Sequence, residues 1–478
     1  MKKTFLTLIV AVSINVCTKA QSISVLHDFG NNAANGLTPK STLISDGTFL
    51  YGTTYDGGNG GSNNNGTIFK IKPDGTSYTV LYDFASYTSG QTRPNGQLLY
   101  DGTYLYGTSS GGGANGVGTI FKIKTDGTGY TILRSFAVGS TSGGFLPYGS
   151  LVSDSTYLYG TTNSGGSSAY GAIYRIKPDG SSYGVIYNFT GTTNSGKNPY
   201  CSLVYDSGYL YGTTPTGGAL NNGTVFKVAV NGTGYTNLIN FANNATSSST
   251  TTGSNPKGSL YYDGTYLYGM TQWGGLYSLG TMFRVKPDGT GYEKIHDFGS
   301  NSSDGAGPLY NNLIGDGTYL YGMTPSGGTA GGIIFKIKPD GTNFTNLYNF
   351  STAGASPYGS LYFDGNYLYG TTYTDGIYGQ GTVFRYLINP ITTNISSVEN
   401  DNSFASVYPN PSNGDFEIIS PNYRNATLRM YDVNGKLVLS QLITDYAKIN
   451  ATNLTCGVYN VNIISNQGSI NKRVVITK

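Results

Sequence analysis

Histidine, tryptophan, cysteine and charge are all scarce in this sequence of 478 residues. It has two histidines, one tryptophan and three cysteines, and only 11% of its residues are charged. The low charge excludes a coiled coil or a helical solenoid, because both are rich in charged helix-forming residues. So few histidines and cysteines supply no Ser-His-Asp or Cys-His set, no disulfide framework and no catalytic zinc site. We therefore expect neither a metal nor a cofactor.

Glycine and aromatic residues are abundant instead. The chain has 71 glycines, 43 tyrosines and 20 phenylalanines. The glycines lack the one-in-three spacing of collagen, and 13% aromatic residues are too many for a disordered chain. The composition indicates an all-β protein with many turns.

The N-terminus has the features of an export signal. Two lysines precede an apolar run over 5–12, and small residues around Ala20 form a cleavage site, so we predict a Sec signal peptide over 1–20. Cys17 offers a lipoprotein alternative, which the residues before it disfavour. Removing the three lysines of this leader leaves 25 basic and 25 acidic residues. A neutral surface argues against nucleic acid or an anionic membrane as a partner, and no later apolar run is long enough for a transmembrane segment.

A four-residue motif recurs seven times. Phe-Leu-Tyr-Gly or Tyr-Leu-Tyr-Gly ends at Gly52, Gly107, Gly160, Gly212, Gly269, Gly322 and Gly370. Each copy holds four apolar or alternating runs, named a to d in chain order. Asp-Gly between a and b predicts a type I′ hairpin with positive φ at both central residues, and Lys-Pro-Asp-Gly-Thr predicts a tight turn between c and d. Four antiparallel strands in seven copies predict a seven-bladed β-propeller over 21–388.

The two ends of the array predict how the ring closes. The last copy stops after strand c, and the segment 23–29 matches strand d of the first copy at 78–84. Because a tight turn joins c to d, these two strands must pair, so 23–29 should complete blade seven. Strand a should be innermost, since seven converging strands need small residues there. Its opening positions are Ser41, Gly96, Gly149, Cys201, Gly258, Asn311 and Gly359.

The loops at one end of the blades are the candidate binding face. The a–b and c–d turns share one end and are nearly identical in all copies, whereas the b–c and d–a loops at the other end vary. Binding residues usually lie on variable loops of a rigid scaffold, and exposed aromatics suit sugar rings or protein partners. The candidates are Tyr55, Asp56, Trp273, Asp304, Tyr373 and Asp375. Four of them, at 55, 56, 373 and 375, should cluster after closure with Asp304 near them; the alternative is that all six are ordinary loop residues.

Catalytic chemistry has little support. His27 and His296 occupy the same place in strand d, where other copies have tyrosine, which indicates a structural role. A glycosidase needs two carboxylates roughly 5 to 9.5 Å apart, and the three candidate aspartates all precede glycine, as turn residues do. We predict no catalytic residue, with a polysaccharide-degrading hydrolase or lyase on the same face as the alternative. The strand-c lysines, such as Lys70, should lie with their stems over aromatic surface.

The sequence changes character after residue 388. A polar stretch over 389–403 indicates a linker. Short runs of alternating apolar and polar residues over 404–478 predict a small Ig-like β-sandwich. Its recurring motif residues are Tyr408, Pro409, Asn410, Pro411, Gly414, Tyr431, Asp432, Asn434, Gly435, Gly457 and Tyr459. In this order they resemble a type A sorting domain of the type IX secretion system, with Cys456 as a departure from the small or polar residue common there. The resemblance implies a Gram-negative bacterium, a secretion machinery as partner, removal of this domain, and release or attachment at the cell surface.

The repeats resemble a known type over about 23–388. Asp-Gly-Thr-Tyr-Leu-Tyr-Gly at 101–107 and Gly-Thr-Ile-Phe-Lys-Ile-Lys-Pro-Asp-Gly at 66–75 are similar to the GloVer tandem repeat of secreted proteins. That resemblance implies secretion but no activity. We expect an extracellular or surface-displayed monomer that binds a glycan or a protein, with a passive surface-layer component as a further possibility.

Overall fold

The computed structural model describes residues 23–59, 65–84, 92–139, 143–242, 252–329, 331–350, 355–388, 406–410, 412–419, 426–432, 437–444, 446–465 and 468–477. The chain divides into two units, Met1–Pro390 and Ile391–Lys478. The predicted leader and linker lie outside the described residues. Among the described residues, no helix is long and apolar enough to cross a membrane.

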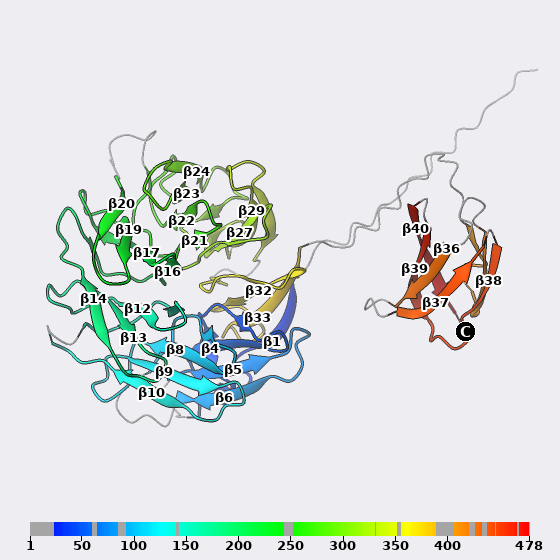
Figure 1. Ribbon diagram of the computed structural model, residues 1–478, viewed down its shortest axis with the longest axis horizontal. Coiled ribbons are helices and arrows are strands. Elements are labelled where there is room, and N and C mark those ends of the chain that lie inside the picture. The colour runs from blue at the N-terminus through cyan, green and yellow to red at the C-terminus, as the bar shows by residue number, and fades with distance from the viewer. Residues whose placement is uncertain are drawn as a thin grey trace, which may run out of the picture. The chain divides into compact units, whose positions relative to one another are not determined.

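The described part of the first unit contains seven larger antiparallel sheets, each with strands in the order a-b-c-d, and two two-stranded ribbons. Figure 1 shows these sheets following one another around a central axis. The four strands of each sheet are joined by short connections, as the repeat predicts. The all-β class is therefore confirmed.

The strands occupy equivalent positions in each copy. The a strands are β3 (Ile44–Ser45), β7 (Leu99–Tyr100), β11 (Val152–Ser153), β16 (Val204–Asp206), β21 (Tyr261–Tyr262), β26 (Ile314–Gly315) and β31 (Tyr362–Phe363). The b strands are β4 (Leu50–Asp56), β8 (Tyr104–Ser109), β12 (Leu158–Thr162), β17 (Tyr209–Thr214), β22 (Leu267–Thr271), β27 (Leu320–Thr324) and β32 (Tyr367–Thr372). The c strands are β5 (Thr67–Ile71), β9 (Thr119–Lys124), β13 (Ala172–Ile176), β19 (Thr224–Ala229), β23 (Thr281–Val285), β29 (Ile333–Ile337) and β33 (Thr382–Leu387). The d strands are β6 (Thr79–Asp83), β10 (Thr131–Ser135), β14 (Gly184–Asn188), β20 (Thr236–Asn240), β24 (Glu293–Asp297), β30 (Thr345–Asn349) and β1 (Ser24–Asp28).

Short additional elements lie on the d–a loops. A 3-10 turn at Ala33–Asn35 precedes β2 (Leu37–Pro39), which pairs with β4. Two small ribbons form from β15 (Gly196–Lys197) with β18 (Thr216–Gly217), and from β25 (Gly305–Ala306) with β28 (Ser326–Gly327). These pairings tie individual d–a loops to the b–c loops of the following copy.

The sheet with strands β31, β32 and β33 takes its fourth strand from the N-terminus. In it, β1 pairs with β33, with Ser24 opposite Arg385 and Asp28 opposite Thr382. Phe29 is fully buried, together with Leu43 and Phe69 of the first copy and Val383 of the last. The two ends of the array therefore share one sheet and one core.

The recurring Tyr-Leu-Tyr-Gly motif has a packing cause. Its second tyrosine is buried in every copy, and its glycine faces an aromatic ring of strand c. A Cβ on Gly52 would lie 2.6 Å from the Phe69 ring, closer than any real contact. The basic residue of strand c covers the motif from outside, with Lys227 Nζ 4.0 Å from the centroid of the Tyr209 ring. These side chains lie over aromatic surface as predicted, but the amine and not only the stem is over the ring: Lys70 Nζ is 4.8 Å from the Phe49 centroid and donates to the Thr125 carbonyl at 3.3 Å.

The a–b turns differ from the predicted type in most copies. In the first copy the central residues are Gly47 and Thr48, and of these only Gly47 has a positive φ, 90°. Asp46 precedes the turn and accepts the N–H groups of Thr48 and Phe49, each at 2.8 Å. The type I′ prediction is wrong here because the aspartate caps the turn rather than occupying its centre. The fourth copy is the exception, since both Ser207 and Gly208 have positive φ.

The second unit consists of two sheets. One has strands β34 (Ser406–Tyr408), β35 (Asp415–Ile419) and β38 (Tyr446–Asn450); the other has β36 (Ala426–Tyr431), β37 (Leu437–Ile443), β39 (Gly457–Ser465) and β40 (Gly468–Ile476). Phe416 and Ile418 of the first sheet pack with Leu428, Met430 and Val461 of the second in one buried core.

Several predicted sorting residues support the geometry of the second unit. Asn410 donates to the Arg473 carbonyl at 2.7 Å and accepts the Val475 N–H at 2.9 Å. The Tyr459 hydroxyl donates to the Thr455 carbonyl. Gly414 has φ 115° and leaves no room for a side chain against Thr452. Pro411, Asn434 and Gly435 lie outside the described residues.

Candidate binding site at the axis of the repeat unit

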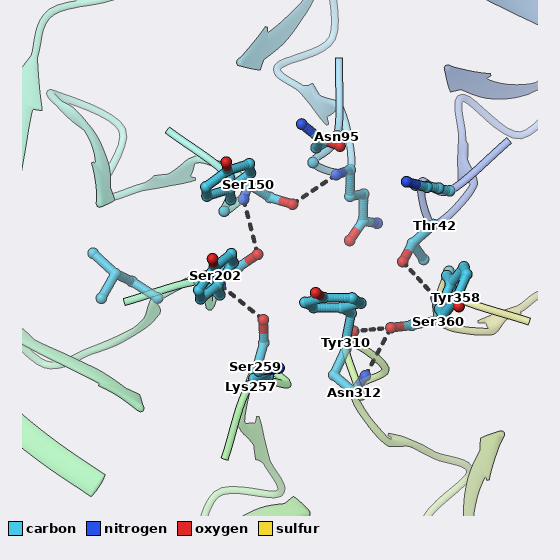
Figure 2. Close-up of a pocket in the computed structure, with 18 of the residues that line it drawn as sticks. Thr42, Asn95, Ser150, Ser202, Lys257, Ser259, Tyr310, Asn312, Tyr358 and Ser360 are labelled. Atoms are coloured by element: carbon cyan, nitrogen blue, oxygen red, sulfur yellow. Dashed lines mark hydrogen bonds between the residues drawn. The ribbon is translucent and has the colours of Figure 1, made fainter. Parts of the chain in front are cut away.

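The axis of the first unit is lined by one polar residue from each copy. This polar belt consists of Thr42, Gln97, Ser150, Ser202, Ser259, Asn312 and Ser360, and Figure 2 shows six of these residues around a central opening. Each lies just before strand a, one residue after the small positions Ser41, Gly96, Gly149, Cys201, Gly258, Asn311 and Gly359.

Hydrogen bonds join neighbouring copies along the belt. The backbone N–H of Gln97 donates to Ser150 Oγ at 2.7 Å, that of Ser150 to Ser202 Oγ at 2.9 Å, and that of Ser202 to Ser259 Oγ at 2.8 Å. The Ser360 N–H donates to Thr42 Oγ1 at 2.9 Å, across 318 residues of sequence. In five of the seven copies a short hydroxyl therefore serves as the acceptor for the copy before it.

Small residues at the preceding position are required by this close approach. A Cβ on Gly149 would lie 2.2 Å from the Cys201 carbonyl oxygen, and one on Gly258 would lie 2.3 Å from that of Asn311. Cys201 is buried, and its Sγ lies 3.2 Å from both the backbone N and the carbonyl O of Thr213. Its role is steric, in agreement with its place among the compact residues.

Above the belt lies an axial cavity of 440 Å³. Its mouth is lined by one residue near a recurring proline in each d–a loop. These are Lys40, Asn95, Tyr148, Tyr200, Lys257 and Tyr358, each directly after the proline, and Tyr310, two residues after Pro308. Tyr55, from the end of β4, joins them. Among the described residues that line this cavity there is no carboxylate. A cavity of this size with convergent polar groups is typical of a small-molecule site.

The tyrosines at the mouth form an arc of contacting rings. The ring centroids of Tyr148 and Tyr200 are 4.8 Å apart, those of Tyr200 and Tyr310 are 6.0 Å apart, and those of Tyr310 and Tyr358 are 6.1 Å apart. Tyr373 extends the arc, 5.3 Å from Tyr358. Burial raises the pKa of the Tyr148, Tyr310 and Tyr373 hydroxyls, so these remain protonated donors at neutral pH.

Three cations accompany the tyrosines. Lys40 Nζ lies 3.6 Å from the Tyr55 ring centroid and 4.7 Å from that of Tyr373, and the Arg93 guanidinium lies 5.0 Å from the Tyr55 ring. Lys257 Nζ is 5.9 Å from the Tyr310 centroid. Burial lowers the pKa of Lys40, an effect that Asp56 opposes and Arg93 reinforces. Burial also lowers the pKa of Lys257.

The predicted binding residues are only partly brought together. Tyr55 lines the cavity, and Tyr373 contacts Lys40 beside it. Asp56 accepts the Thr38 hydroxyl at 2.9 Å and lies near Lys40. Asp375 is half-buried, and its backbone carbonyl accepts the Gly381 N–H, so its loop position is that of a turn residue.

The other two predicted residues have different surroundings. Asp304 is 3% exposed, with Oδ1 3.2 Å from His296 Nε2 and Oδ2 accepting the N–H groups of Gly299 and Ser300. It organises its own d–a loop. Trp273 is 48% exposed in the β22–β23 loop and does not line the axial cavity as described.

Sequence reasoning missed most of the cavity mouth. It favoured residues that differ from other copies in the variable loops, whereas the mouth is formed by residues that come soon after a proline in each d–a segment. The signal was present as Pro-Tyr or Pro-Lys before five of the a strands, as at Pro147-Tyr148 and Pro256-Lys257. Only the convergence of the copies on one axis brings these separated positions together.

Both histidines stack on an aromatic ring of a neighbouring strand or loop. His27 stacks on Tyr78 with ring centroids 3.7 Å apart, and burial lowers its pKa to about 4 despite the opposing charge of Asp28. His296 stacks on Phe344 at 4.2 Å. Asp28 caps a loop through its Oδ2, which accepts the Ile377 N–H at 2.9 Å. Among the described residues, no group of three or more histidines, cysteines or carboxylates could hold a metal ion.

Comparison with known proteins matches both parts of the chain. The sequence matches the Gloeobacter/Verrucomicrobia repeat at residues 12–156, 140–261 and 244–413, and the secretion system C-terminal sorting domain at 406–477. No curated protein sequence matches the chain at a significant level.

Among solved structures, similarity is in the fold alone. The extracellular domain of a one-component system from B. thetaiotaomicron is 12% identical with a TM-score of 0.50, over 96% of this chain and 59% of that one. An oligogalacturonate lyase in complex with manganese is 11% identical with a TM-score of 0.48, over 77% of this chain and 97% of that one.

Proposed function

Since the chain belongs to the Gloeobacter/Verrucomicrobia repeat family and ends in a secretion system C-terminal sorting domain, we propose that it is a secreted glycan-binding protein. The sorting domain indicates type IX export to the cell surface or the extracellular space. The proposal includes a Gram-negative source, a Sec leader over 1–20 and a monomeric chain. It assigns 21–388 to a propeller, 389–403 to a linker and 404–478 to an Ig-like sandwich.

The repeat unit is proposed to be a seven-bladed β-propeller closed by 23–29. This proposal is supported by the pairing of β1 with β33 and by the bond from Ser360 to Thr42, which both join the last copy to the first. Deleting 23–29 removes strand d of one blade and the buried Phe29. We expect the thermal midpoint of the repeat unit to fall by well over 10 °C, and an unchanged midpoint would contradict ring closure.

Glycan binding is supported by the axial cavity. Its mouth presents tyrosine faces, tyrosine hydroxyls and lysine amines, which together suit the apolar faces and hydroxyl rims of sugar rings. The competing hypothesis of a polysaccharide hydrolase or lyase needs positioned acid and base groups, and the described lining has no carboxylate or histidine. The single observation that carries the proposal is this arc of tyrosines around a cavity without such groups.

A glycan array with the full chain tests the proposal. We expect binding that falls about tenfold or more in Tyr310→Ala, because truncation removes both stacking surface and a hydroxyl donor. The matched control is Tyr378→Ala, an exposed tyrosine that does not line the cavity. Absence of binding to every glycan would overturn the glycan ligand and leave a protein partner. Cleavage products in the array eluate would favour the enzyme instead.

A further inference from the structure

The described lining of the axial cavity holds two lysines, Lys40 and Lys257, and no carboxylate. Among the described residues, the side chains of Lys40, Lys257 and the neighbouring Arg93 form no ion pair, and Arg93 Nε is buried without a hydrogen-bond partner. Cations that are partly withdrawn from water are stabilised by an acceptor of opposite charge. A ligand with an anionic group would therefore supply the charge that this end of the repeat unit lacks.

The base of the cavity adds further donors. Ser150, Ser202 and Ser259 use their oxygens as acceptors for backbone N–H groups of the belt, which leaves each hydroxyl proton free to point into the opening. Figure 2 shows these three side chains around the same opening as Lys257, Tyr310 and Tyr358. A ligand that enters from the mouth meets hydroxyl protons as well as amines.

The cations stand on different sides of the opening. Lys40 belongs to the first copy and Lys257 to the fifth, so three copies separate them in one direction along the belt and two in the other. Asp56 is the acidic group near Lys40, and it already accepts the Thr38 hydroxyl. Between the two lysines lies the tyrosine arc. An anionic group held at one lysine therefore leaves the rest of the ligand against aromatic faces.

We propose that the ligand of the axial cavity is an acidic saccharide, with a ring-borne carboxylate bound by Lys257 or Lys40 and the sugar face stacked on Tyr310 or Tyr358. This inference rests on the proposed glycan-binding function and names the class of glycan. Charge-assisted hydrogen bonds from lysine to carboxylate supply the affinity that a neutral sugar cannot obtain here. The tyrosines explain why a saccharide ring, rather than an inorganic anion, fills the cavity.

Titration calorimetry on the full chain tests the charge. The probes are a hexamer of mannuronate, a neutral hexamer of mannose, and poly-glutamate of similar length. We expect the uronate to bind at least about tenfold more tightly than the mannose hexamer, and Lys257→Met with Lys40→Met to remove that difference. The substitution Lys257→Arg keeps the charge and should retain most of the difference in affinity between the two hexamers. Added salt should weaken uronate binding and leave mannose binding unchanged.

A matched control separates the site from general lysine loss. Lys286 lies 5.8 Å from the Tyr266 ring, a contact like that of Lys257 with Tyr310, but outside the cavity lining. Lys286→Met should bind the uronate as the unaltered chain does. Thermal unfolding of each variant shows whether it is folded.

Each outcome bears on a different claim. Equal binding of uronate and mannose hexamers overturns the acidic class while glycan binding stands. Equal binding of poly-glutamate and uronate overturns the saccharide. Absence of binding by both sugars overturns this inference, and the glycan array then decides whether the proposed function stands.

Discussion

The turn end and the loop end of the repeat unit differ in how closely the seven copies resemble one another. At the turn end the same contacts recur: the second tyrosine of the motif donates to the turn aspartate in six copies, as Tyr159 does to Asp154 at 2.6 Å. Basic residues of strand c reach the next copy there, as Lys122 Nζ donates to the Pro178 carbonyl at 3.0 Å. At the loop end the backbone contacts also recur, but the side chain at the cavity mouth changes from copy to copy between lysine, asparagine and tyrosine.

This difference indicates that the turn end stabilises the fold and that the loop end is free to bind a ligand. The tyrosine–aspartate contact fixes each turn, and the basic residues of strand c join four of the sheets to the next, so the turn end holds the scaffold. Because the scaffold is fixed there, the loop end can vary its side chains without loss of the fold. Substitutions and changes of pH can test whether stability depends on the turn end and binding on the loop end.

Removing a turn carboxylate should cost stability and leave binding intact. Asp154 accepts the N–H groups of Thr156 and Tyr157 and the hydroxyl of Tyr159. Asp154→Ala leaves these donors without their acceptor, and we expect a loss of about 1–3 kcal/mol in the free energy of unfolding. Chemical denaturation measures this loss. Asp154→Asn keeps one acceptor oxygen and should recover part of it; reduced glycan binding in a folded Asp154→Ala protein would contradict the division.

Acid should destabilise the turn end in a defined window. Burial alone would raise the pKa of Asp46, Asp101, Asp154 and Asp316, but their hydrogen bonds lower each pKa below the ordinary value of 3.8. Since the folded pKa lies below the unfolded one, this stability is present above 3.8 and is lost as the pH falls through the folded pKa. The thermal midpoint should therefore decline below about pH 4.

Protonation of His27 should cause a separate loss of stability at higher pH. Its folded pKa of about 4 lies below the unfolded 6.5, so the unfolded chain binds the proton first and stability declines as the pH falls from 6.5 toward 4. His27→Tyr introduces the residue found at the equivalent position 82 and should remove this decline while the decline below pH 4 persists. A midpoint that stays constant to pH 2 in both proteins would show that the turn carboxylates do not stabilise the fold.

The smallest effect is expected at Trp273. Its side chain is about half exposed and does not line the cavity as described, so Trp273→Ala should change the free energy of unfolding by less than about 0.5 kcal/mol and leave glycan affinity unchanged. Calorimetry and denaturation measure both quantities. A loss of affinity would place the binding surface on the β22–β23 loop instead of the axis.

Much of the fold was predictable because the repeat is local. Strands a to d follow one another through short turns, so hydrophobic alternation and Asp-Gly signals locate them in each copy. The a–b turn type was not predictable from the dipeptide alone, because the capping bonds of Asp46 depend on the chain that follows it. The mouth of the cavity was missed for a different reason: Tyr148, Tyr200, Tyr310 and Tyr358 each look like an ordinary loop residue in their own copy.

The sequence by itself determined the all-β class, the repeated strand order, and the export of the chain, which its C-terminal sorting domain indicates. These features depend on residues close together in the chain, whose spacing and turn chemistry leave few alternatives. Tertiary structure alone decided which residues meet at the axis and that Lys40 and Lys257 share one cavity whose described lining holds no carboxylate. That juxtaposition depends on seven copies converging around a common axis, which no single copy encodes.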